Sequence, residues 1–177
     1  MNIQSLTDLL IEELQDLYNA EQQLAKALPD LAEAAFSEEL RDAFETHTQE
    51  TQQHVQRLEQ IFKALKTPAK AKHCPAMAGL IEETQELLEQ ESEADPTVLD
   101  AALIMAAQKV EHYEIASYGS ARTFAETLGA REVAKLLQQT LDEEAETDRK
   151  LTALATSTIN LDAAESDQEI QSEAGRN

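Results

Sequence analysis

The chain has 177 residues and a formal net charge of −21, with only four glycines and four prolines beside abundant Ala, Leu, Glu and Gln. This composition predicts one all-α domain with a substantial core, and the absence of any apolar run of about 18 residues argues against a membrane span. The acidic charge, the 4% aromatic content and the lack of tryptophan argue against direct nucleic-acid binding, which uses basic stripes and stacking platforms.

The first expected helix runs from Ser5 to Phe36, with Ser5 or Thr7 as its N-cap. Its apolar stripe consists of Leu10, Leu14, Leu17, Leu24, Leu28 and Leu31. Glu21 occupies the place in this stripe where the next apolar residue is expected, and a carboxylate at a core position is costly unless it is paired. Pro29 lies inside the pattern, which predicts a kink or a break just before it.

The second expected helix runs from Ser37, its N-cap, to Lys66. Its inner stripe consists of Leu40, Phe44, His47, Thr51, His54, Leu58, Ile61 and Leu65. Glu50 lies three residues after His47 and four before His54, and this spacing places all three on one helix face, within reach of one metal centre. Each histidine could instead be a hydrogen-bonded core residue, so whether His47 or His54 binds a metal directly stays open.

The connection to the next long helix contains an element of its own. A Lys/Ala-rich loop from Pro68 to Pro75 precedes a shorter helix from about Ala76 to Glu93. Residues Ser92 to Pro96 then break the chain again. We therefore expect a long crossover between two pairs of long helices.

The third long helix is expected from Thr97 to Leu128, where Gly129 ends it, and the fourth from Ala130 to Thr158. Short links make each pair of long helices an antiparallel hairpin. Together they predict a ferritin-like four-helix bundle with one long crossover containing an extra short helix. The bundle domain comprises residues 1–159, and the acidic tail of residues 160–177 is expected to be disordered.

The last two long helices also carry acids on or beside their inner stripes. Glu111 and Glu114 are three residues apart, while Glu144 and Asp148 are four apart. Glu111 could face water one step off the stripe, Asp148 could pair with a neighbouring basic residue, and Glu143 is expected to face water. Four helices that each place an acid inward are the pattern of a bundle holding a metal pair. This carboxylate-rich set suits iron best and manganese as an alternative.

The compartment is indicated by two features. Cys74 is the only cysteine, so no internal disulfide or cysteine-based zinc site is expected. Met1 is not followed by a basic or apolar leader segment. Both features favour the cytoplasm.

Several stretches resemble the bacterial YciE/YciF stress-protein family, a ferritin-like domain of unknown function. They are Asp16–Leu24 (DLYNAEQQL), His47–Thr51 (HTQET), Ala107–Gly119 (AQKVEHYEIASYG) and Leu141–Asp148 (LDEEAETD). The resemblance covers about residues 1 to 160. It implies a rubrerythrin-like di-metal centre, a homodimer, and metal ligation by Glu21, Glu50, Glu111, Glu114 and Glu144. Two features depart from rubrerythrin: Gln53 stands where a Glu-x-x-His motif would have its histidine, and no rubredoxin-like module with four cysteines is present as an electron donor.

The resulting hypothesis is a di-iron or di-manganese protein of oxidative or general stress defence, with the reduced metal pair reacting with peroxide or dioxygen. The candidate ligands are Glu21, Glu50, His54, Glu111, Glu114, Glu144 and Asp148. Peroxidase or catalase-like turnover is the favoured activity. The alternatives are a protein that sequesters metal without turnover and a structural bundle that acts as a stress-induced interaction partner.

Overall fold

The computed structural model describes residues 3–166 of the chain. Its α-helices are α1 (Leu6–Ala34), α2 (Glu38–Ala64), α3 (Pro75–Leu88), α4 (Pro96–Thr127) and α5 (Arg131–Leu154), followed by the π-helical turn Ala155–Ile159. No strand occurs among the described residues. The all-α prediction is confirmed.

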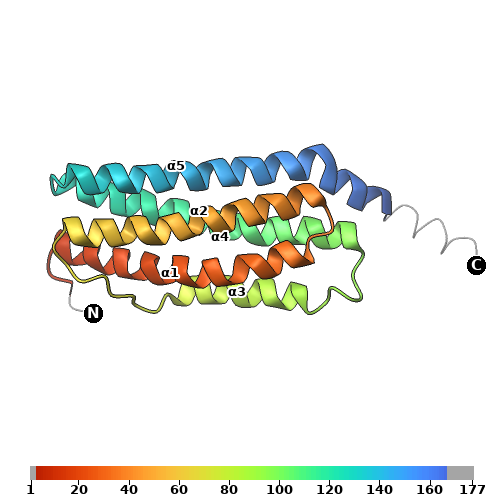
Figure 1. Ribbon diagram of the computed structural model, residues 1–177, viewed down its shortest axis with the longest axis horizontal. Helices are drawn as coiled ribbons and strands as arrows, with labels where there is room; N and C mark the ends of the chain where they lie inside the picture. The colour runs from red at the N-terminus through yellow and green to blue at the C-terminus, as the bar shows by residue number, and fades with distance from the viewer. Residues whose placement is uncertain (1–2, 167–177) are drawn as a thin grey trace, which may run out of the picture.

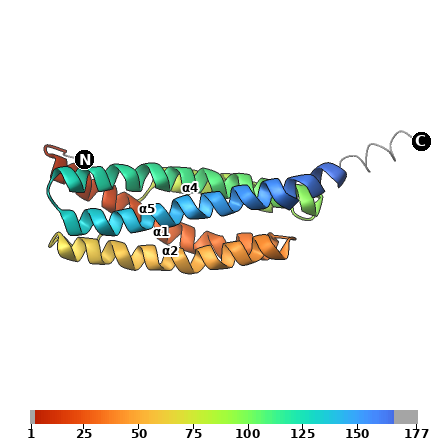
Figure 2. The ribbon, with the colours of Figure 1, turned by 90° about the horizontal axis from the view of Figure 1, so that it is seen from above.

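The four long helices form two antiparallel hairpins that lie side by side, as Figures 1 and 2 show. Helix α1 packs mainly on α2, and α4 packs mainly on α5. The crossover from α2 to α4 carries α3, which lies against α1 and α4 (Figure 1). This is the predicted four-helix bundle with one long crossover. Within residues 3–166, no helix is both long and apolar enough to span a bilayer.

Local sequence signals set most helix ends. The side chain of Ser5 accepts a hydrogen bond from the Asp8 N–H at 3.1 Å, and Ser37 accepts one from the Leu40 N–H at 3.3 Å. Both are the predicted N-caps. Gly129 adopts a φ of +74°, which a residue without a Cβ reaches easily, and so allows the tight turn between α4 and α5.

We predicted a kink or a break at Pro29, and the break does not occur: α1 continues through this residue to Ala34. Proline removes one backbone hydrogen bond from a helix interior. Leu28 and Leu31 are buried on either side of it, at 1% and 5% exposure. Packing on both sides keeps this segment helical, although the local sequence alone favours a break.

The chain after α5 also differs from expectation. Residues 160–166 are helical, although we expected the acidic tail to lack regular structure. Ile159 is buried, and the Ser166 hydroxyl donates to Asp95 Oδ2 at 2.6 Å, so this segment has tertiary contacts that its composition does not reveal. The remainder of the predicted tail, residues 167–177, lies outside the described residues.

The apolar core is divided into two clusters along the bundle axis. On α1, Leu17 belongs to one cluster and Leu24 to the other; on α5, the corresponding residues are Leu137 and Leu151. Glu21 lies between the first two in the sequence. A buried polar layer therefore crosses the bundle where the apolar stripes are interrupted.

Candidate metal centre

Six buried acids and histidines form the layer between the apolar clusters. They are Glu21 from α1, His47 and His54 from α2, Glu111 and Glu114 from α4, and Glu144 from α5. None is more than 3% exposed. We call these residues the polar layer. The helical stripes bring them together because each occupies an inward position at the same level of the bundle.

The polar layer contains two overlapping groups that could each hold a metal ion. His47, Glu111, Glu114 and Glu144 form the first group, and Glu21, His54 and Glu144 form the second. In each group one ligand atom per residue lies within 4.8 Å of all the others. Glu144 belongs to both groups, so its carboxylate would be available to a cation in either of them.

The polar layer leaves many buried oxygen atoms without a hydrogen bond. Among the described residues, both carboxylate oxygens of Glu114 and both of Glu144 have no hydrogen-bond partner, and the same is true of one oxygen each of Glu21 and Glu111. Buried polar atoms are nearly always hydrogen-bonded, because an unpaired one loses its hydration without compensation. Converging unpaired oxygens fit a metal centre, and a set of carboxylates with two imidazoles suits iron or manganese.

The pKa values indicate how the layer behaves without a cation. Burial and the charges of Glu21, Glu144 and Glu111 raise the pKa of Glu114 well above its usual range. Burial also raises the pKa of Glu144 to about 7, although His54 opposes this shift. The metal-free layer therefore retains protons that cations would displace.

His54 lies between two acids of the polar layer and Glu143, an acid outside it. Its Nδ1 lies 2.9 Å from Glu144 Oε1 and 3.4 Å from Glu21 Oε1, while its Nε2 is hydrogen-bonded to Glu143 Oε2 at 2.9 Å. Burial lowers the pKa of His54, but the two layer acids outweigh it and raise the value to about 10. A proton shared between Nε2 and Glu143 leaves Nδ1 free to face a cation.

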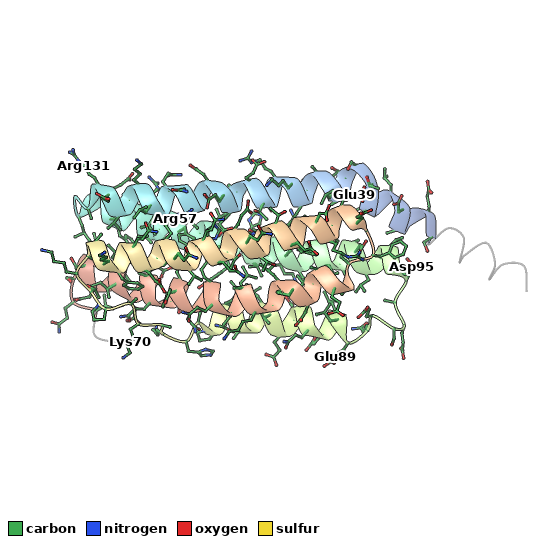
Figure 3. The ribbon with its side chains drawn as sticks, viewed as in Figure 1. Glu39, Arg57, Lys70, Glu89, Asp95 and Arg131 are labelled. Carbon is green, nitrogen blue, oxygen red and sulfur yellow. The ribbon has the colours of Figure 1, made fainter. Side chains whose placement is uncertain are left out.

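Arg57 holds the Glu143 carboxylate in place. Its guanidinium donates two hydrogen bonds to the Glu143 carboxylate, at 2.7 and 3.1 Å, and one to the Thr140 hydroxyl at 2.6 Å. Arg57 projects from α2 into the space between α2 and α5 (Figure 3). A bidentate pair of this kind restricts the carboxylate to one orientation. The expectation that Glu143 faces water was therefore wrong, since it is half-buried and bonded to both Arg57 and His54.

His47 holds the corresponding place in the other group. Its Nε2 lies 3.1 Å from Glu111 Oε1, and its Nδ1 lies 3.7 Å from Glu50 Oε2. Burial lowers the pKa of His47, but Glu111 outweighs it and raises the pKa well above the usual value. The sequence left the role of His47 open and allowed Glu111 to face solvent; the structure places both in the polar layer.

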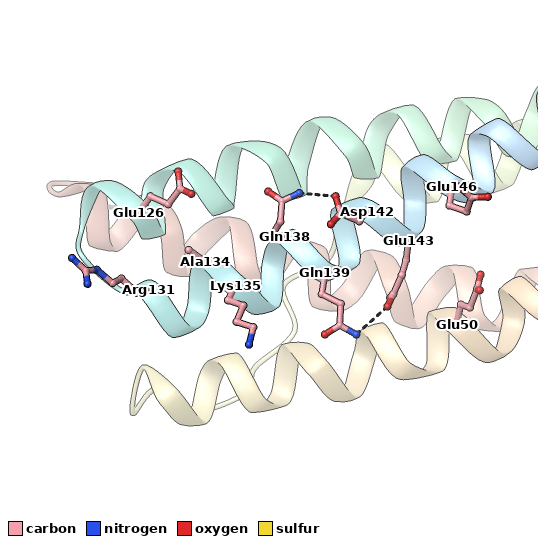
Figure 4. A pocket seen from close by; sticks show the side chains of 10 residues that line it. All are labelled: Glu50, Glu126, Arg131, Ala134, Lys135, Gln138, Gln139, Asp142, Glu143 and Glu146. Carbon is pink, nitrogen blue, oxygen red and sulfur yellow. Dashed lines mark hydrogen bonds between the residues drawn. The ribbon is translucent and has the colours of Figure 1, made fainter.

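Two predicted ligands, Glu50 and Asp148, are not brought into either group. The Glu50 side chain is 29% exposed and lies beside the groove between α2 and α5 drawn in Figure 4. Asp148 accepts a hydrogen bond from Gln108 at 2.9 Å and lies 3.4 Å from His112 Nε2. Asp148 follows Glu144 by four residues, and four residues rotate a side chain about 40° past a full turn of an α-helix. Asp148 therefore points toward the outer edge of α4 and does not lie directly beside Glu144.

The three tyrosines near the candidate acids have different partners. Tyr118, fully buried, donates a hydrogen bond to Glu21 in the polar layer. Tyr18 instead bonds Glu59 at 2.8 Å, and Tyr113 bonds Asp16 at 2.7 Å. Of the three, Tyr118 alone orients a layer acid directly.

The fold and this site define an all-α bundle protein with a buried acid–histidine cluster suited to metal. The chain belongs to the family described as domain of unknown function DUF892, whose model matches residues 5–164. This confirms the resemblance to the YciE/YciF proteins, because YciF of Escherichia coli K12 is 48% identical over 164 residues, covering 92% of this chain and 98% of YciF.

Solved structures agree with this assignment. The crystal structure of the E. coli stress protein YciF matches with a TM-score of 0.85 at 48% identity, covering 89% of this chain and 99% of that one. YcfI of Rhodopseudomonas palustris, described as a candidate structural protein, matches with a TM-score of 0.81 at 44% identity, covering 85% and 95%. A Xanthomonas campestris protein shares the fold at 22% identity, with a TM-score of 0.73 and coverage of 93% and 99%.

Proposed function

We propose that this YciF-like stress protein binds two iron or manganese ions in its polar layer and that the reduced pair reacts with peroxide or dioxygen. The observation that carries the proposal is Glu114, whose two buried oxygens have no hydrogen-bond partner within the described part of the chain. The proposed ligands are Glu21, His47, His54, Glu111, Glu114 and Glu144. Bound in the reduced state, such a pair supplies the electrons that reduce an oxidant.

The surrounding residues give this layer a fixed form. Arg57 holds Glu143, which in turn orients His54, and Tyr118 orients Glu21. The apolar clusters on both sides restrict water, which strengthens the attraction between the carboxylates and a cation. The chain thus holds its ligands ready before a cation arrives, which is the condition for selective binding.

Metal content is the first test. Protein produced in medium replete in iron and manganese should contain two metal ions per chain by elemental analysis. A protein without metal would contradict the proposal and favour a structural role, in keeping with the description given to YcfI.

Reaction with an oxidant is the second test. The reduced, metal-loaded protein should be oxidised faster by hydrogen peroxide than by dioxygen at equal concentration in stopped-flow absorbance, as the resemblance to rubrerythrin suggests. Faster oxidation by dioxygen would favour an oxidase. A loaded protein that reacts with neither would be a metal-sequestering protein.

The family resemblance also leads us to propose a homodimer, and the single cysteine supports a cytoplasmic location. Cys74 is fully buried, and burial raises the pKa of its thiol, so this cysteine is poorly suited to form a disulfide with another chain. Light scattering of the purified protein measures the oligomeric state directly.

A further inference from the structure

A cavity of about 410 Å³ between α2 and α5 reaches the polar layer from the surface. His47 and Glu111 line its inner part and are 3% and 1% exposed. Its lining also includes Glu39 and Asp42, both exposed, and the half-buried Glu50. The cavity therefore connects acids at the surface with two members of the layer.

The His47 ring indicates which kind of ligand this cavity suits. Within residues 3–166, neither of its ring nitrogens has a hydrogen-bond partner, although the side chain is almost fully buried. The ring lies between Glu50, 3.7 Å from Nδ1, and Glu111, 3.1 Å from Nε2. An acid, an imidazole and a second acid thus follow one another from the half-exposed side chain to the buried one. Such a series of nitrogen and oxygen ligands favours a cation.

We propose that this cavity is the passage by which a divalent cation reaches the polar layer, and that Glu50 captures the ion and passes it to His47 and Glu111. The inference rests on the proposed function and deepens it, because it assigns a route and a loading residue to the same site. The net charge of −21 supports it, since a strongly negative protein raises the local concentration of cations.

The neighbouring groove on the same face fits this role less well. It is larger, about 770 Å³, and is drawn in Figure 4. None of the described residues that line it belongs to the polar layer. Its lining includes Glu143, whose carboxylate Arg57 already holds, and Glu50, which it shares with the proposed passage. An ion in that groove would reach Glu50 but not His47 or Glu111, which line only the passage of these two.

The test is the rate of Co²⁺ uptake by the metal-free protein, followed by stopped-flow absorbance of the bound ion. Glu50→Gln should slow uptake about thirtyfold at low salt, the effect of one unit charge on a divalent cation roughly 4 Å away in water. Glu45→Gln is the matched control, because it removes the same charge from an exposed position on α2 that lines a different groove. Lys150→Gln should instead speed uptake, since Lys150 is an exposed cation beside the passage.

The final Co²⁺ content should equal that of the wild type in all three variants, and the rate differences should shrink at high salt because exposed charges are then screened. Equal uptake rates for Glu50→Gln and Glu45→Gln would contradict the proposed passage. Faster uptake by Glu50→Gln than by the wild type would contradict it as well. A lower final content in Glu50→Gln would make Glu50 a ligand and also overturn its role in loading. Wild-type protein that binds no Co²⁺, iron or manganese at all would instead contradict the proposed function itself.

Discussion

The two candidate ion positions share Glu144 but differ in how the protein supports them. The position formed with Glu21 and His54 is braced from outside, by Tyr118 and by the Arg57–Glu143 pair. The position formed with His47, Glu111 and Glu114 adjoins an open cavity and has no comparable brace among the described residues. One helical layer thus contains a rigid position and an accessible one. We infer that the rigid position binds more tightly and the accessible one exchanges faster.

The largest effect is expected at the shared carboxylate. Glu144→Gln should abolish binding of both ions, because each group loses a charged ligand and the second group is left with two. Asp142→Asn, an exposed acid on the same helix, should leave metal content at the wild-type value. Elemental analysis after loading and dialysis measures both variants. Retention of one ion by Glu144→Gln would show that the two positions do not share this residue.

A residue that belongs to one group should affect one ion. Glu114→Ala should reduce the content from two ions to about one, leaving the position that contains Glu21 and His54. Glu126→Ala removes an exposed acid from the same helix, paired with Arg122 at 2.8 Å, and should retain both ions. Equal metal content in the two variants would contradict the inference that an acid binds metal because of its inward position on the helix.

The brace should affect affinity rather than stoichiometry. Glu143→Ala removes the partner of His54 Nε2, and loss of such an outer partner costs about 10–100-fold in metal affinity. Competition with a chelator of known affinity measures the change at each position. Only the tighter position should weaken, so a uniform loss at both would indicate a general disturbance of the layer. Glu146→Ala is a control on the same helix.

The regular parts of this structure were accessible from sequence, because they depend on local periodicity. The apolar stripe of α1 and its interruption at Glu21 follow from the 3.6-residue repeat, and both the helix and the buried acid are where that repeat places them. The N-caps follow from short-range chemistry in the same way. The break that we allowed at Pro29 does not occur, because packing on both sides of it outweighs a local preference.

The details of the site were less accessible, because they depend on the rotation of each helix about its axis and on distant partners. His47 and Glu50 are neighbours on one face, yet only the first turns fully inward. Glu143 and Arg57 are 86 residues apart in the chain, so no local sequence pattern indicates that they pair. The position of Arg57 was a signal for this pairing: it lies one turn after His54 on an inner face, where a buried guanidinium requires an acid.

The smallest expected effect concerns the metal-free protein, in which neither position is filled. The folded-state pKa of Glu144 is raised to about 7 and that of Glu114 is raised as well, so the folded protein binds more protons than the unfolded chain. The raised pKa of His54, about 10, acts in the same direction as the pH falls toward its unfolded value near 6.5. Stability should therefore increase as the pH falls from about 8 to about 5.

Thermal unfolding followed by circular dichroism should show a rise in Tm of roughly 5–10 °C over this range. Glu143 and Glu50 have lowered pKa values and oppose the trend only below about pH 4.5, where they take up protons. Glu114→Gln should make the dependence less steep, because an amide does not titrate while Glu144 and His54 still do. The metal-loaded protein should show the opposite slope, since protons then compete with the cations for the same carboxylates. Opposite slopes would tie the buried protons to the metal positions, whereas a flat or falling Tm in the metal-free protein would mean that the layer acids are not buried together.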